Sequence, residues 1–239
     1  LNKKKIIKNI QAEARSSRYD ILINFCKKNK IRAILTAHNL EDQVETFYIR
    51  LSRGSGLDGL SSMKEMNKIN HDINLVRPLL DFKKNQLVRI SKLIFGKFYK
   101  DPTNENKKYL RTRIRNLQKL LEKSGINYDQ IFRSIKNLAS SRDTLDIYFS
   151  KIYKSTLIKK KNRIFINIKI LDSLNEEMKM RVLKKSIQDL TKTYYAPRSK
   201  KIFNLIKNMK TAKNPKFTLG GCLILRVKNH IIVEKENKN

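Results

Sequence analysis

A histidine and three carboxylates fall within one short stretch of this sequence, residues 36–46, and could do chemistry together. His38 and Asp42 are four residues apart. A carboxylate at Asp42 could hold Mg²⁺ between phosphates or orient an incoming amine, and His38 would shape the same crevice. The alternative is that Asp42 only caps a helix and His38 only fills a turn.

Two arginines and a glycine-rich turn follow directly. Arg50 and Arg53 are three residues apart, so both can lie on one helix face beside the turn that begins at Gly54. Planar guanidinium groups suit a bidentate grip on phosphate. A solvated helix end, in which arginine favours the C-terminal dipole, is the alternative.

A second polar cluster lies further along the chain. Asp101 and Asn104 belong to the turn-forming run Asp-Pro-Thr-Asn, and Arg111, Arg113 and Arg115 follow within about one turn of a predicted helix. Contact with RNA phosphates would explain such a set. A turn followed by a basic surface helix explains it equally well.

The surrounding elements indicate an α/β arrangement. Ile31–Leu35 predicts a buried strand, and Asn39–Ser52 predicts a helix with Asn39 as its N-cap. The polar residues therefore lie where a strand ends and a helix begins, which is where open α/β sheets place ligands. A flexible turn is expected over 54–59. Further helices are expected over 3–29, 83–98, 110–149, 175–190 and 198–209, with a strand over 163–170 and a hairpin over 216–234 that turns at 228–229.

Composition restricts the class of protein. The 239 residues carry 54 Lys+Arg against 21 Asp+Glu, a formal charge of +33, which favours a polyanionic partner such as nucleic acid. A biased composition rich in Lys, Ile and Asn is the competing explanation. Cys26 and Cys222 form no C-x-x-C pair and the three histidines are scattered, so a zinc or iron–sulfur site is not expected. The sequence shows neither a membrane span nor a signal peptide, which predicts a cytoplasmic protein.

Taken together, the two clusters resemble the tRNA(Ile)-lysidine synthetases, an N-type ATP-pyrophosphatase family. The matching elements, in order along the chain, are Ala37–Thr46, Arg50–Leu60, Arg77–Leu80, Asp101–Asn104 and Leu110–Arg115. Two features depart from the family. Thr112 stands where asparagine is usual, and the P-loop Ser-Gly-Gly-x-Asp-Ser is absent, since no glycine precedes Gly54. We therefore expect an N-terminally incomplete catalytic domain.

The resemblance implies ligation of L-lysine to the wobble cytidine of tRNA(Ile) with a CAU anticodon. ATP would adenylate the C2 carbonyl oxygen, and the lysine ε-amine would then displace AMP. Asp42 and His38 would be the catalytic residues, with Asp42 also a Mg²⁺ ligand. The ATP site itself is unknown without the P-loop, and the fragment is expected to be inactive alone. The residues implied in contacting tRNA are Arg50, Arg53, Gly54, Asp101, Asn104, Arg111, Arg113 and Arg115.

The expected fold class is α/β, in three parts. Residues 1–115 would be the C-terminal part of a parallel-sheet ATP-pyrophosphatase domain, 116–150 a helical linker, and 151–239 a small α+β tRNA-binding domain. The oligomeric state is open, with a homodimer as one option. Two other functions remain open: an ATP-pyrophosphatase that thiolates tRNA, and a non-catalytic RNA-binding remnant.

Overall fold

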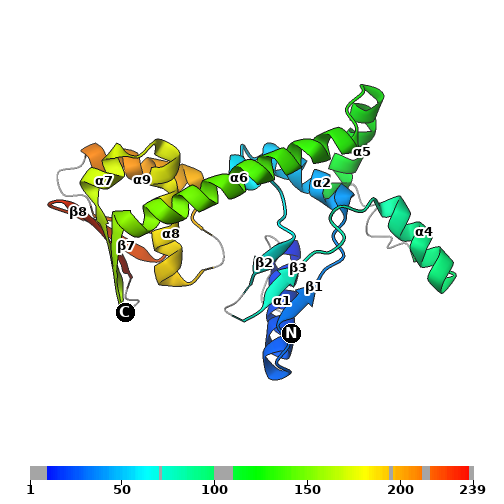
Figure 1. The fold of residues 1–239 in the computed structure, drawn as a ribbon, viewed down its shortest axis with the longest axis horizontal. Coiled ribbons are helices and arrows are strands. Elements are labelled where there is room, and N and C mark those ends of the chain that lie inside the picture. The colour runs from blue at the N-terminus through cyan, green and yellow to red at the C-terminus, as the bar shows by residue number, and fades with distance from the viewer. Residues whose placement is uncertain (1–9, 70–71, 100–109, 194–195, 212–215, 237–239) are drawn as a thin grey trace. The chain divides into compact units, whose positions relative to one another are not determined.

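The structure is a computed structural model that describes residues 10–69, 72–99, 110–193, 196–211 and 216–236 (Figure 1). The chain divides into two compact units, Leu1–Arg142 and Asp143–Asn239. The boundary falls within one long helix, α6 (Tyr128–Thr156). Each unit has its own core and is described separately.

The first unit contains a small sheet of three strands, β1 (Ala33–Leu35), β2 (Met66–Lys68) and β3 (Asn74–Val76). The strand order is β1-β3-β2, in which β1 pairs with β3 in parallel and β2 pairs with β3 in antiparallel fashion. The parallel pair agrees with the α/β class expected from the sequence, and β2 was not predicted.

Helix α1 (Ile10–Lys28) packs on this sheet through a compact apolar cluster (Figure 1). Cys26, Ile34, Ile73 and Leu75 are buried in it. The expected helix over 3–29 is thus confirmed from Ile10 to Lys28, and its first residues lie outside the described part of the chain.

The remaining helices of the first unit are α2 (Leu40–Leu51), α3 (Leu57–Leu60), α4 (Lys84–Phe95), α5 (Leu110–Lys123) and the start of α6. Helix α2 packs on α6 through a second buried cluster, formed by Leu40, Val44, Ile131 and Ile135. This contact fixes the orientation of α2, whose polar side chains form the candidate site.

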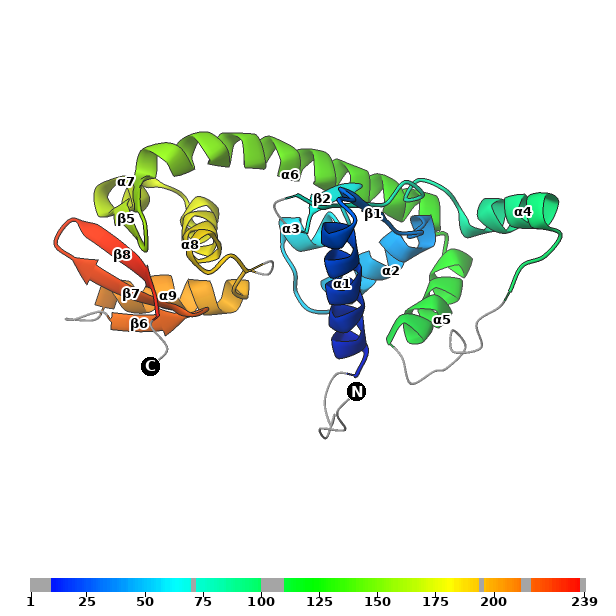
Figure 2. The same ribbon diagram turned by 90° about the horizontal axis from the view of Figure 1, so that it is seen from below.

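The second unit is a five-stranded antiparallel sheet with helices packed against it (Figure 2). Its strands have the order β4-β5-β8-β7-β6. Side chains of α8 and α9 share one buried core with side chains from the inner strands. The elements are β4 (Leu157–Lys160), β5 (Arg163–Asn167), α7 (Ile168–Ser173), α8 (Glu176–Thr191), α9 (Ser199–Thr211), β6 (Lys216–Leu219), β7 (Cys222–Val227) and β8 (His230–Lys235).

Three expectations about secondary structure need correction. The expected strand over 163–170 ends at Asn167, because the side chain of Asn167 accepts a hydrogen bond from the backbone of Ile170 and so begins α7. The expected helix over 110–149 is two helices, since Gly125 adopts a φ of +87° between α5 and α6. The glycine-rich turn contains the one-turn helix α3.

The hairpin turning at 228–229 is confirmed, and β6 extends it to a three-stranded meander. In the described part of the chain, no helix combines the length and the apolar character needed to cross a membrane.

Candidate functional site

The candidate site begins where β1 ends. The backbone N–H of Thr36 donates to the carbonyl of Val76 at 2.9 Å, so the chain leaves the sheet just beyond this residue. The Thr36 hydroxyl then lies 2.9 Å from Nδ1 of His38, which fixes the imidazole next to the strand end.

Asp42 caps the helix that follows. The Asn39 side chain accepts a hydrogen bond from the Asp42 backbone at 3.0 Å, and Oδ2 of Asp42 accepts from the Asn39 backbone at 3.1 Å. This capping box satisfies two donors at the start of α2. The N-cap predicted at Asn39 is therefore confirmed, and Asp42 has the capping role that was one of the two alternatives. Its carboxylate is half-buried and also lines a cavity.

His38 lies in a cationic environment. Burial lowers the pKa of His38 below its usual value; Asp42 opposes this shift, whereas the positive charges of Arg77, Arg15 and Arg111 reinforce it. His38 is therefore a neutral imidazole at pH 7. The arginines that act on it come from three other parts of the first unit.

A cavity of about 470 Å³ opens beside Asp42 between α2 and α5. Four carboxylates and two cations line it, so its charge is net negative although the whole chain is strongly basic. The lining residues are Asn39, Glu41, Asp42, Glu45, Lys84, Arg115, Gln118, Glu122 and Tyr128.

An ion pair between two lining residues, Glu45 and Arg115, lies in the wall of this acidic cavity. The Glu45 side chain is only 3% exposed, and the Arg115 guanidinium donates to both of its oxygens, from Nε to Oε1 and from Nη2 to Oε2 at 3.3 Å. Burial nonetheless raises the pKa of Glu45, because the hydrogen bond and charge of Arg115 only partly offset the lost hydration.

The carboxylates around the cavity affect the pKa of Tyr128. Burial raises the pKa of Tyr128 to about 12, and the carboxylates of Glu45, Glu122 and Glu41 add to the rise. The phenol therefore stays protonated and can donate a hydrogen bond to a ligand.

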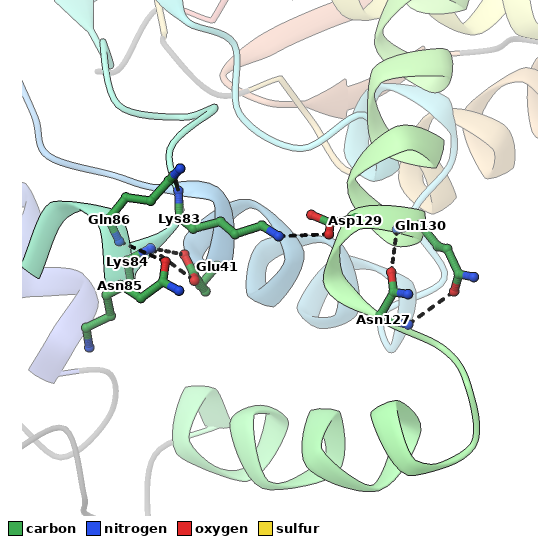
Figure 3. A network of polar contacts seen from close by, with 8 residues as sticks. All are labelled: Glu41, Lys83, Lys84, Asn85, Gln86, Asn127, Asp129 and Gln130. Atoms are coloured by element: carbon green, nitrogen blue, oxygen red, sulfur yellow. Dashed lines mark hydrogen bonds and ion pairs between the residues drawn. The ribbon is translucent and has the colours of Figure 1, made fainter. Parts of the chain in front are cut away.

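Polar contacts join the starts of α2, α4 and α6 next to the cavity, which Glu41 and Lys84 line (Figure 3). The Glu41 carboxylate accepts the backbone N–H of Lys84 at 2.9 and 3.0 Å, which caps α4 from α2. Lys83 Nζ lies 2.8 Å from Asp129 of α6. These contacts therefore connect three separate segments of the first unit beside the cavity.

Arg50 holds the glycine-rich turn in place. Its Nη1 donates to the carbonyls of Gly59 and Ser62, at 2.7 and 2.9 Å. Gly54 has a φ of +63°, and a Cβ on Gly59 would lie 2.5 Å from Cβ of Ser55, so both glycines are required for this shape. Arg53, by contrast, is exposed beside the turn.

The structure places the other predicted residues in different environments. Arg113 is exposed, Arg111 is half-buried near His38, and Arg115 contacts Glu45 inside the first unit. Asp101 and Asn104 lie outside the described residues. Asp42 and Arg115 thus line one cavity, His38 lies near Asp42, and Arg50 and Gly54 belong to the adjoining turn.

Several cavity residues were not predicted: Gln118, Glu122, Tyr128 and Lys84. One signal could have found two of them. Arg115, Gln118 and Glu122 are spaced three and four residues apart, which places them on one face of α5. Tyr128 and Lys84 come from the starts of other helices, and no local pattern links them to α2.

Among the residues that the structure describes, no group of three or more His, Cys, Asp or Glu side chains could hold a metal ion. Cys26 and Cys222 are both free and buried.

The chain belongs to the PP-loop domain family, whose model matches residues 1–121. It is similar to curated proteins named tRNA(Ile)-lysidine synthase. The one from Wolbachia pipientis wMel is 34% identical over 240 residues, covering 98% of this chain and 55% of that protein. The one from Rickettsia akari (strain Hartford) is 32% identical over 234 residues, covering 95% and 53%. The chain thus spans about half the length of the curated relatives it matches.

One solved structure is also similar, the U34-tRNA thiolase NcsA from Methanococcus maripaludis with its [4Fe-4S] cluster. The TM-score is 0.45 at 20% identity, over 56% of this chain and 46% of that chain. This similarity is too low to support an argument about function.

Proposed function

We propose that this chain is part of a cytoplasmic enzyme that attaches L-lysine to the wobble cytidine of tRNA(Ile) with a CAU anticodon, at the expense of ATP. The observation that carries the proposal is the acidic cavity between α2 and α5, which lies beside a cationic region around His38 in a chain of charge +33. The cavity suits an amine, and the basic surroundings suit RNA and phosphate.

The proposed reaction has two steps. ATP first adenylates the C2 carbonyl oxygen of cytidine and releases pyrophosphate. The ε-nitrogen of lysine then forms a bond to C2, the bond from C2 to the AMP oxygen breaks, and the amine loses a proton. The product is lysidine, and AMP leaves.

Asp42 and His38 would act at the second step. The Asp42 carboxylate can accept a hydrogen bond from the attacking amine and so orient it. Because His38 is neutral at pH 7, it can accept a proton at the same strand end. Mg²⁺ would be carried mainly by the nucleotide phosphates with Asp42 as a protein ligand, which is consistent with the lack of a larger ligand group in the described residues.

The arginines would divide into two roles. Arg53 and Arg113 are exposed and are proposed to contact tRNA directly, together with Arg111. Arg50 and Arg115 already bind groups of the first unit, so we assign them to positioning the glycine-rich turn and Glu45. Gly54, Asp101 and Asn104 stay proposed tRNA contacts.

Thiolation of tRNA is the less supported function. It needs a reactive sulfur, and burial raises the pKa of Cys222, which keeps its thiol protonated. Cys26 is also buried. The third alternative, RNA binding without catalysis, differs from the proposed function in its products and is tested with it.

The experiment places this chain in the Wolbachia pipientis relative, in exchange for the region that it matches, so that the hybrid has the full length of that protein. The hybrid is incubated with ATP, Mg²⁺, L-lysine and a tRNA(Ile) transcript with a CAU anticodon, and the digested nucleosides are analysed by mass spectrometry. We expect lysidine. Asp42→Asn should reduce its formation at least about 100-fold, whereas Asp72→Asn, an exposed aspartate of the first unit, should not.

A hybrid that binds the tRNA but forms no lysidine would favour the non-catalytic alternative. A hybrid that incorporates sulfur would favour thiolation. An Asp42→Asn hybrid with full activity would contradict the role given to Asp42.

A further inference from the structure

Gln118 of α5 lies in the wall of the acidic cavity with its hydrogen-bonding capacity unused. The residue is only 2% exposed, and neither Oε1 nor Nε2 has a hydrogen-bond partner among the described residues. Buried amide groups are almost always hydrogen-bonded, because burial without a partner is costly. An unsatisfied amide beside a cavity therefore points to a ligand that satisfies it.

Several neighbouring side chains already have partners within the protein. Arg115, three residues before Gln118 on the same helix face, binds Glu45. The Glu41 carboxylate accepts the backbone N–H of Lys84 at the start of α4. The charges of Glu45, Arg115 and Glu41 are thus engaged in contacts within the protein, whereas the amide of Gln118 is not.

The chemistry of an amide defines what can satisfy it. Its oxygen accepts a hydrogen bond and its nitrogen donates, so the ligand must offer a donor and an acceptor close together. An ammonium group offers donors only. The zwitterionic end of an α-amino acid offers both, an ammonium and a carboxylate on one carbon.

We propose that Gln118 is a specificity-determining residue that binds the α-amino and α-carboxylate end of L-lysine. The inference rests on the proposed function, which makes L-lysine a substrate of this cavity. In this arrangement the amide of Gln118 binds the α-amino and α-carboxylate groups of lysine, and the cavity carboxylates bind its side-chain amine.

The test compares two ligands that differ only in the carboxylate, L-lysine and the diamine cadaverine. Their affinities are measured by isothermal titration calorimetry with the 239-residue chain, its Gln118→Met variant and a control, Asn116→Met. Methionine keeps the volume of glutamine and removes the amide. Asn116 is an exposed amide on the same helix.

We expect Gln118→Met to raise the Kd of L-lysine about tenfold or more and that of cadaverine clearly less, because cadaverine has no carboxylate to which Nε2 could donate. The melting temperature of the ligand-free variant should not fall, because the substitution removes an unsatisfied buried amide. The control should bind both ligands as the parent chain does.

The other outcomes are distinct. An equal loss for both ligands would show that Gln118 only supports the shape of the cavity, and an unchanged affinity for L-lysine would show that the amide contacts no ligand. Either result overturns the role of Gln118 and leaves the proposed function standing. A parent chain that does not bind L-lysine would overturn the proposed lysine site and this inference with it.

Discussion

The ion pair between Glu45 and Arg115 gives the sharpest prediction about the candidate site. Arg115→Met removes the cation and leaves a carboxylate that is 3% exposed. Breaking a buried pair in this way costs about 3–5 kcal/mol when both partners are buried. Arg115 is 30% exposed, so water can reach part of the vacated space. We therefore expect a loss of about 2–3 kcal/mol at pH 7.

The loss should depend on pH in a defined direction. The pKa of Glu45 is raised above its usual value of 4.5, so the folded chain holds this proton to higher pH than the unfolded chain does. The contribution of Glu45 to the free energy of unfolding is therefore largest below pH 4.5, the pKa in the unfolded chain. This contribution falls as pH rises through the folded pKa. Without Arg115 the pKa rises further, which extends this window towards neutral pH. Acidification from pH 7 to pH 5 should restore much of the lost stability.

The assay must resolve the first unit, because the two units need not unfold together. Hydrogen exchange followed by mass spectrometry on peptides from α2 and α5 gives a local free energy of opening at each pH. Arg113→Met, an exposed arginine on α5, is the matched control and should change stability by less than about 0.5 kcal/mol. In a Glu45→Gln background, Arg115→Met should show no such pH dependence. An equal loss at pH 5 and pH 7 would refute the explanation by a buried charge.

Two further predictions concern the turn and the second unit. Gly59→Ala should destabilise the first unit by about 1–3 kcal/mol, because its Cβ would lie 2.5 Å from that of Ser55. The control Gly56→Ala has open space around its Cβ and should be tolerated. Thermal unfolding of both variants tests this, and equal losses of stability would contradict it. Burial would raise the pKa of Asp189, but hydrogen bonds from two lysines outweigh it, and the net shift is downward. This carboxylate should therefore stabilise the fold above its unfolded pKa, and the benefit should disappear as pH falls through the folded pKa. Asp189→Asn should cost about 1 kcal/mol at pH 7 and less at pH 3, as measured by urea unfolding; a larger loss at pH 3 would show that the sign is wrong.

The sequence predicted the elements of the site better than its contacts. A strand before His38 and the N-cap at Asn39 were predictable, because apolar patterning and capping preferences act over a few residues. The strand is shorter than the expected Ile31–Leu35, and only Ile34 within it is buried. The pairing of Glu45 with Arg115 was not, because the two residues are 70 positions apart in sequence. An arginine-rich helix start looks the same whether it faces RNA or a buried carboxylate, and only packing of α5 against α2 decides between them.

The second unit shows the same limit. The turn at 228–229 was predictable from its residues, whereas β4 was missed because Leu157–Lys160 is a largely exposed, lysine-rich edge strand. Likewise, Asn167 ends a strand only because its side chain caps α7.

We propose that the acidic cavity between α2 and α5 binds an amine substrate, L-lysine. A crystal structure of the chain with L-lysine would show whether it does. We expect the amino acid in this cavity, with its side-chain amine near Asp42 and its α-amino and α-carboxylate groups at Gln118. An empty cavity at a lysine concentration that saturates binding, or lysine bound in the second unit, would contradict it.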